Sequence, residues 1–294
     1  MSKLTRRRML QVGAAALGAA AIPSLGSAAE PRNGEGNDPF GGFTVGIQSY
    51  SYRKFSLERA LEQIQMLGVR HVELYREHVP INATDAQMKA FRNLFEKYRV
   101  APVAFGVERF TKDHDANRRL FQFARALGVR SLSADPDPDS FDSLDKLVAE
   151  FNISIAIHPH GPVNNGKDLH RWHSAEAIME AVRNRHRLIG SCLDTGHLIR
   201  SAQDPFNRKL DPAEQVRAMG ARNFGMHLKD HDNKNRRDVV FGRGVLNVPS
   251  ILRALREVKF QGYIAIEYEA NPENPTPDIR ACLDVFRESV RKLS

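Results

Sequence analysis

The chain has 294 residues, of which 41% are hydrophobic and 27% are charged, as is typical of a soluble globular protein with an ample core. Its length fits either one large α/β barrel or two ordinary domains. The formal charge of +8 comes from 43 basic and 35 acidic residues, but residues 1–29 hold four of the basic residues and none of the acidic ones. Without them the balance is 39 against 35, or +4, which is too mild to indicate a nucleic-acid partner.

The N-terminus resembles a twin-arginine export signal. Residues 5–11 read TRRRMLQ, and an Ala/Gly-rich apolar stretch follows over residues 12–22. Small residues at 26–29 offer cleavage after Ala28 or Ala29. The apolar stretch is shorter than the roughly 20 residues that span a bilayer, so no stable membrane anchor is expected after cleavage. We expect residues 1–29 to direct the folded protein to the periplasm and residues 30–42, rich in Gly and Pro, to form a flexible linker.

From residue 43 onward, predicted strands and helices alternate. The expected strands cover residues 43–50, 69–75, 100–107, 129–134, 153–158, 188–194, 223–228 and 263–268. The expected helices cover residues 57–67, 84–98, 117–127, 144–151, 175–183, a stretch starting at 211, 249–258 and 277–292. Two segments, QMLGVRHVEL and RALGVRSLSA, repeat the same helix–glycine–strand joint. Eight such units predict a (β/α)8 TIM barrel over residues 43–294, and no glycine-rich nucleotide turn follows the first strand to favour a doubly wound sheet.

One stretch, LIGSCLDTGH at residues 188–197, combines a buried strand with two chemically active side chains. Asp194 ends the apolar run, and a glycine-containing turn brings His197 back three positions later. Such a pair suits a metal ligand or an acid/base group. The alternative is structural, with Asp194 capping the next helix and His197 packing on it.

Polar side chains also end the neighbouring strands of the second half. In a barrel the functional groups lie at the carboxyl ends of the strands, and alternation along each strand places small residues beneath these polar ones. The groups at these ends are His158 and His160, Asp194 and His197, His227 with Lys229 and Asp230, and Glu267 with Glu269. We expect His158, Asp194, His227 and Glu267 to bind one divalent metal ion. Mixed nitrogen and oxygen ligands favour Mn, Fe, Co or Zn over Mg or Ca.

The order CLDTGH, HLKD, FGRG and IAIEYE resembles that of the xylose-isomerase-like barrel superfamily, which includes sugar isomerases and epimerases, inosose dehydratase and endonuclease IV. The resemblance covers residue 44 to the C-terminus. It implies a divalent metal bound by Asp194, His227 and Glu267, and a small sugar or keto-sugar whose adjacent oxygens chelate the metal. The chain departs from the epimerases at the fifth strand, where they usually have a glutamate and this sequence has His158.

A reaction can be predicted from these residues. The metal would polarise a carbonyl and stabilise an enediolate, while Glu267 or Lys229 removes the neighbouring carbon-bound proton. Because a metal-bound His158 cannot act as a second base, isomerisation or elimination on one face is favoured over epimerisation.

Four more side chains are candidates for contacting the substrate. Glu73 and His160 would hold or protonate sugar hydroxyls, with pairing to Arg53 or Arg76 as the alternative for Glu73. His197 would bind the substrate. Trp172 would either stack on a sugar ring or simply pack.

Other activities stay open at this point. Elimination from a 3-keto-glycoside, by a lyase or hydratase of the same fold, is the first alternative. An endonuclease IV-like AP endonuclease would need more histidines on the second and third strands, where His71 stands alone. A non-catalytic sugar-binding barrel would lack the metal. The sequence leaves the sugar, the metal and the oligomeric state open.

Overall fold

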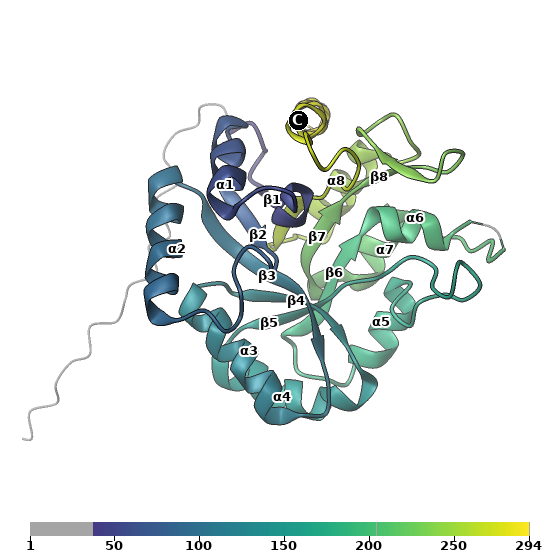
Figure 1. Cartoon of the computed structure of the whole chain (residues 1–294). Helices are drawn as coiled ribbons and strands as arrows, with labels where there is room; N and C mark the ends of the chain where they lie inside the picture. The colour runs from purple at the N-terminus through teal and green to yellow at the C-terminus, as the bar shows by residue number, and fades with distance from the viewer. Residues whose placement is uncertain (1–37, 204, 294) are drawn as a thin grey trace, which may run out of the picture. The chain divides into compact units, whose positions relative to one another are not determined.

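The predicted barrel is confirmed. The computed structural model describes residues 38–203 and 205–293, in which eight parallel strands close in the order β1-β10-β7-β6-β5-β4-β3-β2. Helices surround the strands, as Figure 1 shows. The barrel strands are β1 (Thr44–Gln48), β2 (His71–Leu74), β3 (Ala101–Phe110), β4 (Ser131–Pro136), β5 (Ser154–Ile157), β6 (Ile189–Asp194), β7 (Asn223–Leu228) and β10 (Tyr263–Ile266).

Each predicted helix is present, with shifts at several ends. The helices are α1 (Leu57–Met66), α2 (Asp85–Tyr98), α3 (His114–Leu127), α4 (Phe141–Phe151), α5 (Ala175–Val182), α6 (Thr195–Ser201), α7 (Pro212–Met219), α8 (Val248–Glu257) and α9 (Thr276–Arg291), with short 3-10 turns η1 (Ser49–Tyr52), η2 (Pro138–Ser140) and η3 (Gly220–Arg222). Side chains at the helix starts explain some of these boundaries. Thr84 forms a capping box with Gln87, and the Asp113 carboxylate accepts the Ala116 N–H, which starts α3 earlier than predicted.

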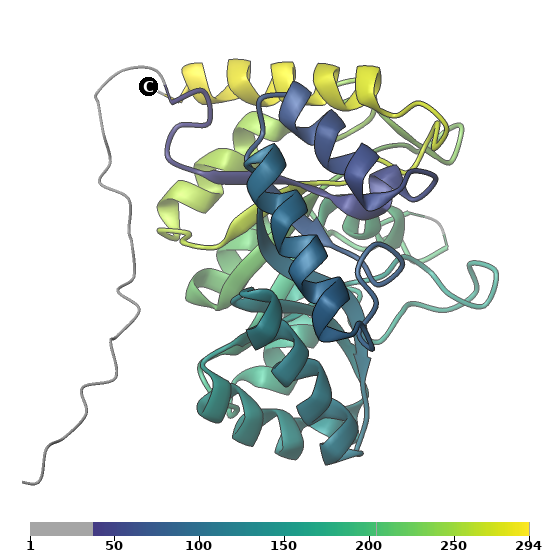
Figure 2. The same cartoon turned by 60° about the vertical axis from the view of Figure 1, so that its left-hand side comes forward.

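Two elements near the carboxyl end of the barrel add to the eight expected units, and the first of them, a helix capped by Asp194, is the structural alternative that the sequence left open. The expected glycine turn after β6 is instead the start of α6, because the Asp194 side chain caps it by accepting the His197 N–H at 2.7 Å. The segment after β7 forms an antiparallel hairpin of β8 (Asp230–Asp232) and β9 (Arg237–Val239). This hairpin and the long loop after β5 project from the same end of the barrel (Figure 2).

Small residues fill the barrel lumen below that end, as the alternation predicted. Ala104, Ala156, Cys192 and Ala265 form a buried cluster with Tyr263. The Tyr263 ring needs a glycine opposite it, since a Cβ at Gly225 would lie 2.6 Å from a ring carbon. The lumen is therefore filled with packed side chains, which support the side chains above them.

The described chain starts within the expected linker and corrects its last part. Phe40 packs edge-on against Phe286 of α9 with ring centroids 6.0 Å apart, and the Asp38 carboxylate accepts the N–H groups of Phe40 and Gly42. Residues 38–42 thus belong to the barrel. The predicted signal peptide and residues 30–37 lie outside the described residues. No helix within residues 38–203 and 205–293 is long and apolar enough to cross a bilayer.

Candidate functional site

Four buried side chains from four strand ends meet at the carboxyl end of the barrel. They are the four predicted metal ligands, His158, Asp194, His227 and Glu267, and each offers a ligand atom within 4.8 Å of the others. The sheet register explains this meeting, because β7 lies between β6 and β10 and pairs His227 with Asp194 on one side. Residues at matching heights of neighbouring parallel strands point to the same end of the lumen.

The distances within this cluster suit a metal ion. His158 Nε2 lies 3.0 Å from His227 Nδ1 and 3.5 Å from Asp194 Oδ2, and Glu267 Oε2 lies 3.2 Å from His227 Nδ1. Tetrahedral ligands about 2.0–2.1 Å from an ion would be about 3.4 Å apart. Asp194 Oδ2 and Glu267 Oε2 are buried, and both lie beside the Lys229 ammonium group. Two imidazole nitrogens and two carboxylate oxygens at these distances form a donor set that fits a divalent cation.

Asp194 serves both roles that its sequence position suggested. One carboxylate oxygen, Oδ1, accepts the His197 N–H and caps α6, while Oδ2 faces His158. Burial raises the pKa of Asp194, but Lys229 and His158 outweigh this and hold the pKa well below its usual value. The carboxylate is therefore ionised and available to a cation.

Glu73 lies under the cluster and does not reach the substrate space, which corrects its predicted role. Its side chain is fully buried and accepts hydrogen bonds from His227 Nε2 at 2.6 Å and from the Ser133 hydroxyl. Arg76 forms an ion pair with Glu108. The alternative pairing of Glu73 with Arg76 is therefore wrong as well. By holding the Nε2 proton, Glu73 turns the Nδ1 of His227 toward the other ligands, as carboxylates commonly do behind metal-binding histidines.

Lys229 is a buried ammonium group that cannot be the base. Its Nζ lies 2.8 Å from Glu267 Oε2 and 3.4 Å from Asp194 Oδ2, and it also pairs with Glu269. Burial lowers the pKa of Lys229, but these three carboxylates raise it well above its usual value. Its stem passes over Gly196, where a Cβ would lie 2.7 Å from Lys229 Cδ, so the glycine of the DTGH motif makes room for this cation.

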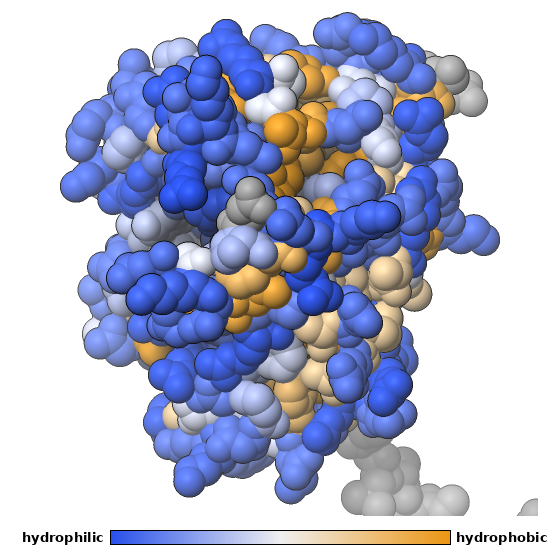
Figure 3. Space-filling view, turned by 90° about the vertical axis from the view of Figure 1, so that its right-hand side faces the viewer, coloured by the Kyte–Doolittle hydropathy of each residue, from blue (hydrophilic) through white to orange (hydrophobic). Residues whose placement is uncertain are grey.

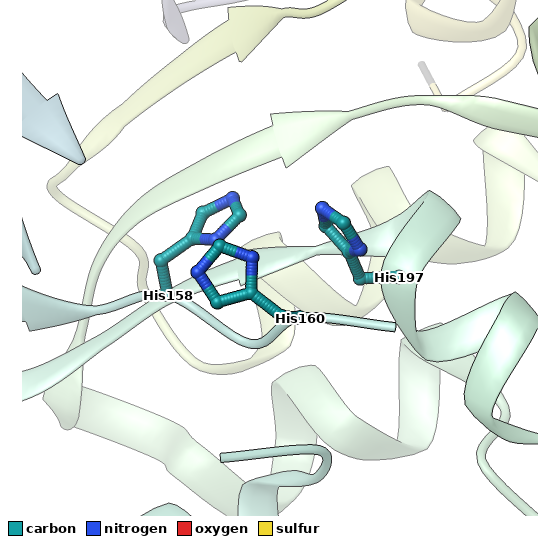
Figure 4. Close-up of side chains that lie close together, drawn as sticks. All are labelled: His158, His160 and His197. Atoms are coloured by element: carbon teal, nitrogen blue, oxygen red, sulfur yellow. The ribbon is translucent and has the colours of Figure 1, made fainter. Parts of the chain in front are cut away.

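His158, His160 and His197 form a second group of imidazoles facing one another (Figure 4). The Gly161 N–H donates to His197 Nδ1 at 2.7 Å, and the Arg200 guanidinium also donates to it. A backbone N–H can only donate, so the lone pair of the neutral His197 ring is at Nδ1 and its proton is at Nε2.

This tautomer decides what the three imidazoles can bind. Burial, Lys229 and Arg200 lower the pKa of His197 well below its usual value and keep the ring neutral. With its lone pair engaged, His197 is a poor metal ligand. Arg200 Nη2, 3.3 Å from His197 Nε2, is itself a donor and cannot accept the Nε2 proton. His197 lines the cavity with the N–H at Nε2 free to donate, and its role in binding a substrate stays a prediction.

A cavity of about 480 Å³ opens above the cluster, within the range of small-ligand sites. His158, His160, His197 and Glu267 line it, as does Glu269. Burial, together with His158 and His170, lowers the pKa of His160 to about 3, so this ring is also neutral. A larger cavity of about 730 Å³ lies at the amino end of the barrel, but no imidazole or carboxylate appears among its described lining residues.

Several cavity residues were missed at the sequence level. Tyr50 and Tyr75 form an edge-on aromatic pair at the cavity wall, 5.4 Å between centroids, and Arg76 pairs with the buried Glu108. Glu108 was missed because the third strand was expected to end at residue 107, whereas β3 continues to Phe110.

Trp172 has a structural position, and the stacking alternative is corrected. Its side chain is buried, its Nε1 donates to the Pro136 carbonyl at 3.1 Å, and its ring packs edge-on against Phe141. Asp230 is also structural, since its carboxylate accepts N–H groups at Gly242, Gly244 and Leu246 and holds the FGRG loop.

A closed parallel barrel with buried imidazole and carboxylate groups gathered at its carboxyl end defines the class as (β/α)8 barrel proteins with a candidate metal site. The chain belongs to the xylose isomerase-like TIM barrel family, whose sequence profile matches residues 61–289. This confirms the predicted family.

Individual relatives are distant. Inosose dehydratase of Lacticaseibacillus casei is 22% identical over 260 residues, covering 76% of this chain and 86% of that protein. D-psicose 3-epimerase of Clostridium cellulolyticum H10 superposes with a TM-score of 0.65 at 15% identity, over 84% of this chain and 99% of that one. The 3-keto-D-glucoside 4-epimerase of E. coli gives a TM-score of 0.64 at 13% identity, with the same coverage. These likenesses show the shared fold.

Proposed function

We propose that the protein is a metal-dependent enzyme that moves a proton next to the carbonyl of a sugar or keto-sugar. The observation that carries this proposal is the four-residue cluster, in which Glu267 also lines the cavity. His158, Asp194, His227 and Glu267 would hold the ion. A divalent cation there supplies Lewis-acid polarisation of the substrate carbonyl.

Glu267 is the group best placed to take the proton. Burial raises its pKa, but Lys229 and His227 lower it below the usual value, so the carboxylate is ionised. Asp194 is fully buried and acts only as a ligand and a helix cap. In the proposed step the C–H bond breaks, its proton moves to Glu267, and its electron pair shifts toward the carbonyl oxygen. The His197 Nε2–H and the Lys229 ammonium both stabilise the negative charge that develops.

Proton transfer on one face of the carbon is consistent with isomerisation or elimination. In isomerisation Glu267 returns the proton to the neighbouring carbon, while the hydroxyl proton moves from one substrate oxygen to the other. In elimination the bond between carbon and the leaving oxygen breaks, and that oxygen takes the proton that Glu267 removed. Elimination from a 3-keto-glycoside is the second candidate. The activities of an inosose dehydratase that resembles this chain in sequence and of a 3-keto-D-glucoside 4-epimerase of the same fold support it. Export by residues 1–29 belongs to the same proposal, because a periplasmic enzyme meets glycosides there.

The structure bears on the rival classes through particular residues. An endonuclease with a metal cluster would draw histidines from β2 and β3, but His71 is the one imidazole on those strands and its Nδ1 lies 3.3 Å from the Val45 carbonyl, toward the amino end. A sugar-binding barrel without chemistry would not need an ionised carboxylate beside a buried ammonium group.

The test combines metal analysis with proton exchange. The purified full-length protein is assayed for bound Mn, Fe, Co and Zn, then incubated in heavy water with aldoses, ketoses and 3-keto-glycosides. We expect about one equivalent of metal and stereospecific deuterium incorporation without inversion. Glu267→Gln abolishes exchange, whereas Glu257→Gln, at a surface ion pair with Arg217, serves as the matched control and leaves it intact. Efficient inversion by the unmodified protein contradicts the one-face mechanism. If none of the tested sugars exchanges a proton, the proposed enzymatic activity is contradicted.

A further inference from the structure

A second cavity, of about 460 Å³, adjoins the cavity of about 480 Å³ above the four-residue cluster, which we call the metal cavity. The proposed chemistry does not use this second cavity. His160 and His197 line both cavities and so form the partition between them. The outer walls come from Asp135 in β4, His170 in the loop after β5 and Arg200 in α6. This loop and α6 lie on the side of the molecule seen in Figure 3, where the surface is mainly hydrophilic with smaller hydrophobic groups between.

The walls of the second cavity contain both a donor and an acceptor that lack partners among the described residues. Arg200 Nε and Asp135 Oδ1 are buried and make no hydrogen bond there. His170 adds a second donor, because its Nδ1 accepts the Trp172 N–H at 3.3 Å, which leaves the proton of the neutral ring on Nε2. His170 Nε2 is 3.6 Å from Asp135 Oδ1, too far for a hydrogen bond.

This mixture of groups discriminates among occupants. A metal ion is disfavoured because Arg200 is a cation and the lone pair of His197 is already engaged. An anion would meet the Asp135 carboxylate, whose pKa lies below its usual value although burial raises it, since His170 and His160 lower it. An apolar group would leave the buried polar atoms unpaired. A neutral group with several hydroxyls, each able to donate and accept, satisfies both kinds of wall atom.

We infer that the second cavity binds the second sugar unit of a disaccharide, whose first unit lies in the metal cavity. This rests on the proposed function for the position of the reacting unit. The glycosidic linkage would cross between the cavities beside His160 and His197, so the substrate class narrows from free monosaccharides to glycosides with a polyhydroxylated aglycone.

Binding measurements test this without requiring turnover. Metal-loaded full-length protein is titrated calorimetrically with cellobiose, lactose, maltose, trehalose and sucrose, and with methyl β-D-glucopyranoside and methyl α-D-glucopyranoside as single-unit probes. Two added buried hydrogen bonds give roughly a tenfold gain in affinity, so at least one disaccharide is expected to bind about tenfold more tightly than either methyl glycoside.

Variants on the outer wall locate the gain. Asp135→Asn replaces one acceptor oxygen with a donor and reduces the preference for that disaccharide to about twofold or less, as does Arg200→Gln. Asp135 is the cleaner site because Arg200 also contacts His197. A third variant, Val163→Trp, places a large side chain in the second cavity and removes the preference for the disaccharide. It tests the inference independently if Asp135→Asn or Arg200→Gln fails to fold.

The outcomes separate the two proposals. Equal affinities for disaccharides and methyl glycosides overturn the inference, whether or not proton exchange occurs. A preference that survives in Asp135→Asn, Arg200→Gln and Val163→Trp also overturns it. A preference lost in these variants supports the inference even when no sugar exchanges a proton, in which case only the proposed reaction fails.

Discussion

Replacing Glu73 by Gln tests whether the buried hydrogen bond behind His227 tunes the metal site. Gln keeps the shape and can still accept the His227 Nε2–H, but it removes the negative charge. A hydrogen bond to a charged group contributes about 1.5–3 kcal/mol and a neutral one about 0.5–1.5 kcal/mol, so the difference is about 1–2 kcal/mol. That corresponds to roughly a fivefold to thirtyfold weaker metal affinity, consistent with the tenfold to hundredfold typical of such partners.

The assay is a competition titration of metal-free protein with Zn²⁺ or Mn²⁺ against a chromophoric chelator. Glu108→Gln is the matched control, since Glu108 is also a buried carboxylate at this end of the barrel, but its hydrogen bonds and ion pair are with Arg76. We expect the control to bind metal with unchanged affinity and both variants to unfold cooperatively. Equal metal affinities for Glu73→Gln and the unmodified protein would refute the reasoning.

Three further predictions concern the ligands, the pH dependence and export. Asp194→Ala and His227→Ala should each purify with little metal, measured by elemental analysis, and a full complement in both would mean that the ligand set is wrong. Burial lowers the pKa of His227, but Glu73 and Glu267 raise it well above its usual value, so the metal-free ring is charged at neutral pH. Metal must displace this proton, so the metal affinity should rise by up to about tenfold per pH unit until the pH passes the raised pKa of His227. Calorimetry in buffers of different ionisation enthalpy should show proton release on metal binding. A metal affinity that does not change with pH argues against His227 as a ligand. Replacing Arg6 and Arg7 by Lys should retain folded protein in the cytoplasm, and unchanged periplasmic delivery in fractionated cells would exclude the twin-arginine route.

Most of the site could be located from the sequence because β-strand alternation is a local property. Asp194 and His227 each end a short apolar strand, and the strand ends of a parallel barrel converge. The same logic failed for Glu108 because the end of β3 was placed three residues early, at residue 107 instead of Phe110. Strand ends depend on pairing with neighbours and are the least local feature of a strand.

The roles of individual side chains were harder to predict. Glu73 was expected to face the sugar, but its neighbours in the closed barrel are Ser133 of β4 and His227 of β7, and no sequence spacing encodes that meeting. Lys229 was a candidate base, yet Asp194 at the end of β6 and Glu267 and Glu269 after β10 surround it and keep it protonated.

The sequence by itself determined the fold class, the family and the strand ends at which the functional groups lie, because hydrophobic periodicity and turn residues act over a few neighbouring positions. Only the tertiary structure decided that Trp172 packs in the core, that Gly161 and Arg200 fix the tautomer of His197, and that a second cavity adjoins the first. Each of these depends on at least one group distant in the chain, such as Gly161 for His197, and hydrogen bonds and charges act only at the distances that barrel closure creates.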